Sequence, residues 1–315
     1  IGSNSESFRE LLLSLANPEQ MLGLSGIYLR DDIVPYSISS DKTKDITDIF
    51  TPFSSLKSLS IRVDSDYEGG LLFLRHFPNL ENLSLYTSAD LAPLATLSNC
   101  KTLSLSGPSD TPLENISVLS GMPQIENLRL SHVMSVKDLN FTQNMPNLKS
   151  LELESVPILS LDGLANHPSL NTLSIDDCYE LTDGKAIAGL SALQSLHLGG
   201  RGHGCYIPDL QNLTALEDVF CGSSDLKHFA HMPSIKSLYC VLNGWNISAE
   251  SLRGMNSLNT LVVSGSLDYI SNDWENVLAG LPNLEKMSIL GESLDLLKDY
   301  HGLFSGIKVK ELIFD

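Results

Sequence analysis

Apolar and polar residues alternate in short segments that recur along most of the chain. The recurring pattern is L-x-x-L-x-L, and successive copies begin 19 to 26 residues apart. A weaker copy covers Leu24 to Leu29. A period in this range indicates one supersecondary unit stacked many times. The first apolar positions of the clear copies are Leu56, Leu80, Cys100, Ile125, Leu148, Leu170, Leu193, Leu216, Ile235, Leu258, Leu284 and Val309.

Each copy predicts one short strand followed by a return segment. The second and third apolar residues of a copy, such as Leu151 and Leu153, point inwards with period two. One copy alone cannot bury them, so we expect neighbouring strands to pair into one parallel sheet. The return segments carry a second apolar set and predict short helices, 3₁₀ turns or loops. The expected fold class is α/β, with the sheet on the concave face of a solenoid and the returns on the convex face.

The two ends of the chain differ. Ser7 and Glu10 make an S-x-x-E capping box, and Phe8, Leu11 and Leu15 share one face of a predicted helix over residues 7–16. We therefore expect a capping helix and lead-in over 1–23, an atypical first repeat with an insertion over 24–55, and about twelve repeats over 56–315. The sequence stops inside the last strand with an uncapped edge, so we expect it to be part of a longer protein.

The repeats resemble the leucine-rich-repeat superfamily over about 260 residues. Residues Asp90–Leu105 are similar to the short repeats of bacterial internalins, and Leu170–Asp183 are similar to the cysteine-containing repeats of F-box substrate adaptors. The resemblance implies a right-handed solenoid that binds protein, as in bacterial secreted or effector proteins. Both families place Asn or Cys eight residues after the first Leu, and only Cys178 and Asn243 match here. We therefore expect irregular loops after the strands.

The net charge of the chain limits the classes of partner that it can bind. The formal net charge of −18 disfavours nucleic acid and anionic membranes, because their phosphates would be repelled. No stretch approaches the roughly 18 apolar residues of a membrane span, so no membrane insertion is expected. The five cysteines show no C-x-x-C spacing, and no metal, cofactor or disulfide framework is predicted. A protein partner, and a basic one in particular, fits this charge best.

Two columns of the predicted strands have structural explanations. The residue two positions after each first Leu is nearly always small and polar, which favours hydrogen bonds between neighbouring strands. The residue just before it alternates in sign across successive strands, which predicts a ladder of exposed ion pairs. The alternating residues are Lys57, Glu81, Lys101, Glu126 and Lys149.

Two further columns, four and six residues after the first Leu, vary, and they predict the partner-binding surface. Their acidic members predict a basic segment in the partner, and their aromatic and aliphatic members predict an apolar anchor. The alternative is that another domain or loop of the intact protein covers this patch. The candidate residues from these columns and their neighbours are Arg129, Glu152, Glu154, Asp176, Asp177, His197, Asp218, Phe220, Tyr239, Val241 and Val262.

The sequence motifs that could indicate a phosphate-binding or metal-binding site match their patterns only in part. The run Gly199–Gly204 follows a strand but lacks the Lys-Ser/Thr of a P-loop, so it predicts a flexible loop. His203, Cys205 and Cys178 have irregular spacing for a metal site. His228 and His231 share a return segment, and a solvated or capping role is the better interpretation.

The chain is therefore expected not to be an enzyme. The leading hypothesis is the recognition domain of a larger bacterial secreted, effector or surface protein with a role in virulence. The alternative is the substrate-recognition arm of a larger enzyme, such as a ubiquitin ligase. Secretion from a bacterium into a host cytosol is the favoured location, with the bacterial surface as the alternative.

Overall fold

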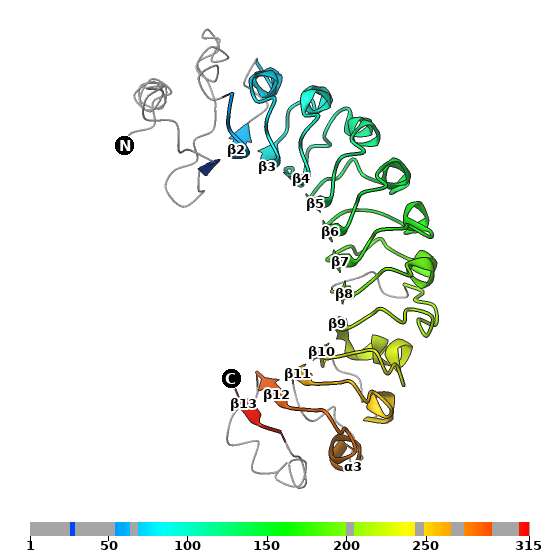
Figure 1. Cartoon of the computed structure of the whole chain (residues 1–315). Helices are drawn as coiled ribbons and strands as arrows, with labels where there is room; N and C mark the ends of the chain where they lie inside the picture. The colour runs from blue at the N-terminus through cyan, green and yellow to red at the C-terminus, as the bar shows by residue number, and fades with distance from the viewer. Residues whose placement is uncertain are drawn as a thin grey trace. The chain divides into compact units, whose positions relative to one another are not determined.

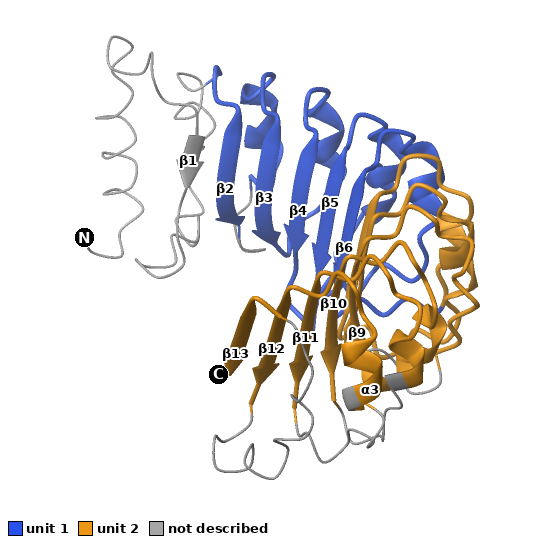
Figure 2. Cartoon of the chain, turned by 60° about the horizontal axis from the view of Figure 1, so that its bottom comes forward, with its two compact units in different colours: residues 1–159 blue, residues 160–315 orange. Residues whose placement is uncertain are grey.

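The structure is a computed structural model that describes residues 26–28, 54–63, 69–199, 205–242, 249–265, 274–291 and 309–314. The chain divides into two compact units, residues 1–159 and 160–315 (Figure 2). The described residues form thirteen strands, whose order in the sheet follows the sequence within each unit. The predicted capping helix over residues 7–16 lies outside the described residues.

Among its described residues, the first unit contains six parallel strands and four 3₁₀ turns (Figure 1). The strands are β1 (Gly26–Tyr28), β2 (Ser58–Val63), β3 (Asn82–Thr87), β4 (Thr102–Ser106), β5 (Asn127–Ser131) and β6 (Ser150–Glu154). The turns are η4 (Leu72–His76), η5 (Ala92–Thr96), η6 (Ile116–Gly121) and η7 (Asn140–Asn144). The weak first copy is thus a strand, because β1 pairs with β2 in parallel.

The second unit repeats this arrangement with seven strands, four 3₁₀ turns and one short helix among its described residues. The strands are β7 (Thr172–Asp176), β8 (Ser195–Leu198), β9 (Asp218–Gly222), β10 (Ser237–Val241), β11 (Thr260–Ser264), β12 (Lys286–Leu290) and β13 (Glu311–Phe314). The returns are η8 (Asp162–Leu164), η9 (Lys185–Gly189), η10 (Ser223–Phe229), η11 (Ala249–Leu252) and α3 (Trp274–Ala279). The parallel sheet and the short returns predicted from the repeat are confirmed.

The core of each unit lies between the strands and the returns. Inward residues such as Leu128 and Leu130 of β5 are buried, together with return residues such as Leu94 of η5 and Leu119 of η6. Burying a leucine side chain contributes about 1.5–3 kcal/mol, so the repeated leucines hold each return against its strand. The opposite side of the sheet points away from the turns, and we call it the strand face.

A ladder of side-chain amides joins successive repeats just before the strands. Asn99 Nδ2 donates to the carbonyl of Pro78 at 2.8 Å, and Asn147 Nδ2 donates to that of Pro123 at 3.1 Å. Asn79 and Asn283, and Gln124 with its longer side chain, make the same kind of bond to the preceding repeat. The sequence predicted Asn or Cys only at the position eight residues after the first Leu. The regular amide ladder instead occupies the residue immediately before that Leu.

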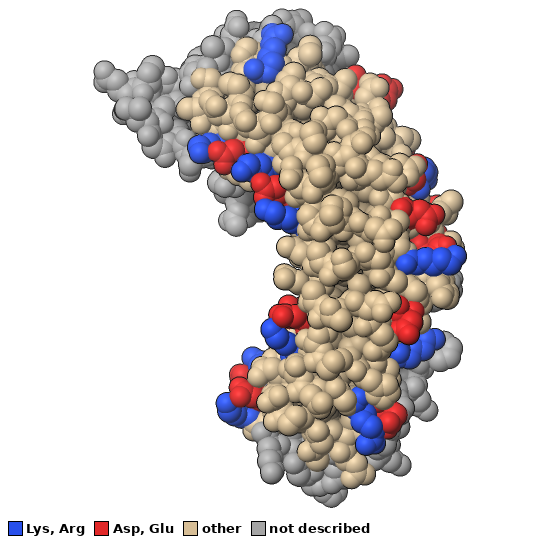
Figure 3. All heavy atoms as spheres, turned by 45° about the vertical axis from the view of Figure 1, so that its right-hand side comes forward, with Lys and Arg blue, Asp and Glu red and all other residues tan. Residues whose placement is uncertain are grey.

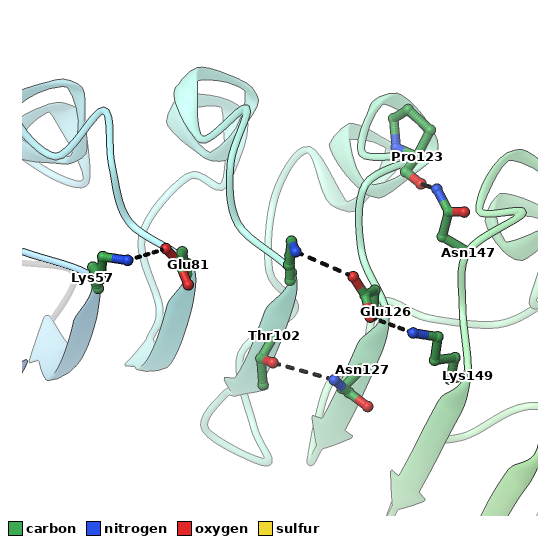
Figure 4. Close-up of polar contacts among 9 residues, drawn as sticks. Lys57, Glu81, Thr102, Pro123, Glu126, Asn127, Asn147 and Lys149 are labelled. Atoms are coloured by element: carbon green, nitrogen blue, oxygen red, sulfur yellow. Dashed lines mark hydrogen bonds and ion pairs between the residues drawn. The ribbon is translucent and has the colours of Figure 1, made fainter.

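The predicted ladder of ion pairs is present (Figure 4). Lys57 lies 2.8 Å from Glu81, and Glu126 lies 2.6 Å from Lys149 and 3.5 Å from Lys101. Hydrogen bonds from Lys57 and Lys149 hold the pKa values of Glu81 and Glu126 below their usual range. The predicted bonds of the small polar column are also present in this unit, from Asn82 to Ser58 and from Asn127 to Thr102.

The same ladder position carries two ion pairs in the second unit that the sequence analysis did not name. Glu217 bonds Lys236 at 2.7 Å, and Glu285 bonds Lys310 at 2.6 Å. Figure 3 shows basic and acidic side chains next to one another along the margins of the face in view, with uncharged side chains between them. Within the described residues, no helix has the length and apolar character needed to cross a membrane.

Candidate functional site

The candidate residues fall into two groups on the strand face. Arg129, Glu152 and Glu154 belong to β5 and β6 of the first unit. The other eight belong to the second unit, on β7 to β11 or directly after β7. Each group is half-buried or exposed, as expected for side chains that point away from the core.

Arg129 holds the two glutamates of the first group. Its Nη1 lies 2.6 Å from Glu152 Oε2, and its Nη2 lies 2.7 Å from Glu154 Oε2. The register explains this fork, because Arg129 stands opposite Glu152 and Glu154 is two residues further along β6. From the sequence, both carboxylates were expected to meet a basic segment of the partner. The structure gives them a cation from the same chain, which balances one of their two negative charges.

Three rings of the second group form a continuous stack. His197, Phe220 and Tyr239 occupy the same position on β8, β9 and β10 and stand opposite one another in the register. The rings of His197 and Phe220 are 3.9 Å apart between centroids and 6° from parallel. Those of Phe220 and Tyr239 are 4.6 Å apart and inclined by 24°. We call these three residues the ring stack. The sequence predicted an apolar cluster here but not that His197 belongs to it.

The ring stack continues into two smaller apolar residues. Val262 stands opposite Tyr239 on β11, and Val241 lies two residues after Tyr239 on β10. Both are half-buried on the strand face. Asp218 precedes Phe220 by two residues on β9 and is exposed. Within the second unit, an exposed acidic residue therefore lies on the same strand as one member of the ring stack.

Asp176 lies against the start of the ring stack. Its Cγ and His197 Nε2 would be 2.8 Å and 3.0 Å from a Cβ atom added to Gly199. Gly199 follows β8, and its backbone N–H donates to the carbonyl of Ile175 at 2.7 Å. The absence of a side chain at Gly199 thus lets the carboxylate of β7 and the imidazole of β8 approach the same point.

Asp177 contacts Tyr179, a residue that was not predicted from the sequence. Its backbone is left-handed, with φ of 50°, and its carboxylate accepts a hydrogen bond from the Tyr179 hydroxyl at 2.5 Å. This bond raises the pKa of Tyr179. The Tyr179 side chain is nevertheless 67% exposed, which makes it one of the most exposed large apolar residues described. Its position in a loop after β7 lies outside the strand columns that the repeat pattern identifies.

Three buried cysteines and one histidine have structural roles. Cys100, Cys221 and Cys240 are buried inward residues, and burial raises the pKa of the Cys100 thiol to about 11. His231 Nδ1 lies 2.6 Å from the carbonyl oxygen of Arg253 in the next repeat. Among the residues that the structure describes, no three His, Cys, Asp or Glu side chains are placed to hold a metal ion. His203 lies outside the described residues.

Comparisons with known proteins show the fold. An internalin from Listeria monocytogenes, InlF, superposes with a TM-score of 0.59 at 19% identity, over 97% of this chain and 94% of that one. Internalin C2 from the same species has a TM-score of 0.48 at 23% identity, over 62% of this chain and 83% of that one. A leucine-rich-repeat protein from Leptospira interrogans has a TM-score of 0.44 at 13% identity, over 100% and 88% of the two chains. No family model and no curated protein matches the sequence.

Proposed function

We propose that this leucine-rich-repeat protein binds a partner protein on its strand face, and that the ring stack is the centre of that interface. The fold supports the general function, since a repeat array offers a long surface that its own core does not use. The finer proposal is that the chain serves as the recognition domain of a bacterial secreted or effector protein.

The ring stack is the observation that carries the proposal. Three planar side chains, followed by Val262, stand in one row on the solvent side of the sheet, next to a column of mostly small, polar residues. A sheet needs no such residues for its own stability, because the inward leucines supply the core. Aromatic side chains clustered on a solvated face are typical anchors of protein interfaces.

Paired affinity capture with quantitative mass spectrometry tests the proposal. The wild-type chain and the double variant Phe220→Ala/Tyr239→Ala serve as baits in the same extract. We expect at least one protein to be retained by the wild type and depleted on the double variant. Its affinity for the double variant, measured afterwards by calorimetry, should fall by about 30-fold or more, which corresponds to about 2 kcal/mol for a hot spot.

The matched control is Leu72→Ala/Tyr206→Ala, which removes two large exposed side chains that lie outside the strands. This variant should retain the same partner as the wild type. Unchanged capture of every protein by the Phe220→Ala/Tyr239→Ala bait would contradict the proposal. Circular dichroism should show the same folded state for all three chains, since none of the four side chains belongs to the core.

A further inference from the structure

We propose that the partner protein places a lysine or arginine side chain on Asp218 of β9, beside the apolar group that covers Phe220. This inference rests on the proposed function and names the charge that the partner presents next to the ring stack. It follows from the contacts of the acidic residues on the strand face and from the neighbours of Asp218 in the sheet.

Acidic residues elsewhere on or beside the strand face contact cations of the same chain. The two glutamates of β6 share Arg129. Glu217, which directly precedes β9, lies 2.7 Å from Lys236. Asp218 differs, because it is exposed and its carboxylate makes no hydrogen bond or ion pair with the residues that the structure describes. The first residue of β9 therefore presents a negative charge that no described cation contacts.

The sheet does not use the carboxylate of Asp218. In the register, Asp218 stands between Ser195 of β8 and Ser237 of β10, and neither of these side chains carries a charge. Elsewhere in this column neutral residues join neighbouring strands, as Asn127 does by donating to Thr102 at 3.3 Å. An ionised aspartate has no donor and cannot make the same bond. The charge at this position is thus not explained by the side-chain bonds of the sheet, which supports a role towards a partner.

The position of Asp218 next to the ring stack determines which partner group fits. Asp218 and Phe220 are two residues apart on β9, so they share one face and lie about 6.6 Å from each other along the strand. A partner group that covers Phe220 also removes water from the neighbouring carboxylate, and a charge without water is costly unless it is paired. Lysine and arginine supply both the opposite charge and hydrogen-bond donors. The complementary partner thus carries one of them beside its apolar anchor.

Selection of random peptides displayed on phage tests the inference without knowledge of the partner. The wild-type chain, Asp218→Asn and Asp218→Lys are immobilised separately, and the peptides that each retains are sequenced. Peptides selected on the wild type should be enriched in Lys and Arg beside an apolar residue. Asp218→Asn should lose this enrichment, and Asp218→Lys should select Asp and Glu instead. Both variants should stay folded, because Asn127 and Lys286 already occupy the first position of β5 and β12.

Glu180→Gln is the matched control, because it removes one negative charge from an exposed turn residue of the same unit. It should select the same peptides as the wild type. A peptide from the wild-type pool should bind Asp218→Asn about threefold or more weakly in fluorescence anisotropy, as expected for one lost ion pair. Equal enrichment of Lys and Arg on wild type and Asp218→Asn, or an equal loss on Glu180→Gln, would overturn the inference.

The same peptides separate this inference from the proposed function. Peptides of the wild-type pool should bind Phe220→Ala/Tyr239→Ala more weakly than the wild type, because their apolar residue loses its contact. Peptides that depend on the ring stack but show no preference for Lys or Arg would contradict the role of Asp218 alone. Peptides that bind the double variant as well as the wild type would contradict the proposed function.

Discussion

Gly265 shows how a single residue restricts the loop after a strand. It follows β11 with φ of +110°, a conformation that other residues rarely adopt, and its N–H donates to the carbonyl of Leu290 at 3.0 Å. A Cβ atom added there would lie 2.6 Å from the carbonyl oxygen of Leu242. That oxygen is part of the backbone, so it cannot rotate away as a side chain would.

We therefore expect Gly265→Ala to lower the free energy of unfolding by about 1–3 kcal/mol, from backbone strain and the close contact. Urea denaturation followed by circular dichroism measures the change. Gly121→Ala is the matched control, because a Cβ atom added at Gly121 meets nothing within 4 Å. The control should stay within about 0.5 kcal/mol of wild type. Equal stability of the two variants would mean that the loop after β11 relaxes freely.

The sequence identifies the residues of the ring stack but not their contacts. Phe220 and Tyr239 were predicted to lie side by side because period two fixes which residues share a face. The parallel arrangement of His197 with Phe220 depends on side-chain torsions, which the repeat pattern does not contain. The Arg129 fork was missed for the same reason, since both glutamates were treated as open to solvent. Tyr179 was missed because it lies in a loop after the strand, where no period applies.

At the scale of elements, repeated side-chain positions bond several neighbouring repeats to one another. The ion-pair ladder was predicted because opposite charges recur at one position of the repeat. The amide ladder was not, although Pro-Asn-Leu occurs at residues 78–80, 146–148 and 282–284. Asparagine in a turn has many local uses, and only the structure shows that these side chains reach the preceding repeat.

The ion-pair ladder predicts that the stability of the protein depends on pH in the acidic range. The hydrogen bond from Lys149, with the attraction of that lysine, holds the pKa of Glu126 below its usual range. A carboxylate with a lowered native pKa contributes stability above its unfolded pKa of about 4.3, and this contribution is lost as the pH falls through the native pKa. Glu126→Gln removes the titrating group. The variant should therefore lose less stability than the wild type between pH 5 and pH 3.

Thermal unfolding at several pH values measures this difference. Glu114→Gln is the control, because Glu114 is exposed and makes no ion pair with the residues that the structure describes. Its profile should follow that of the wild type. If Glu126→Gln and wild type lose stability in parallel across this range, the Glu126–Lys149 pair does not contribute to folding.

At the scale of the whole molecule, we expect the net charge of −18 to influence the rate at which the proposed partner associates. Long-range attraction of a basic partner raises the association rate and is screened by salt, whereas stacked and buried contacts set the dissociation rate. The Debye length falls from about 10 Å at 0.1 M salt to about 3 Å at 1 M. The fold-level features, namely the repeat, the parallel sheet and the acidic charge, were all available from the sequence, because they depend on residue type and spacing alone.

For a partner obtained by the capture described above, we expect the association rate constant to fall at least about tenfold between 0.02 M and 0.5 M salt. The dissociation rate constant should change much less. Surface plasmon resonance at several salt concentrations separates the two. An association rate that does not depend on salt would show that the acidic charge has no role in recognition.

The amide ladder also bears on how such a gene can change length. A repeat that begins with Asn99 or Asn147 offers an amide donor to a backbone carbonyl of the repeat before it, so it fits a preceding neighbour of the same kind. Unequal recombination that duplicates or deletes one such repeat would keep the pattern of amide bonds, although it would place two like charges side by side in the ion-pair ladder. The same event among the repeats of β8, β9 and β10 would break the order of the ring stack. Related genes that differ in copy number should therefore differ outside these three repeats.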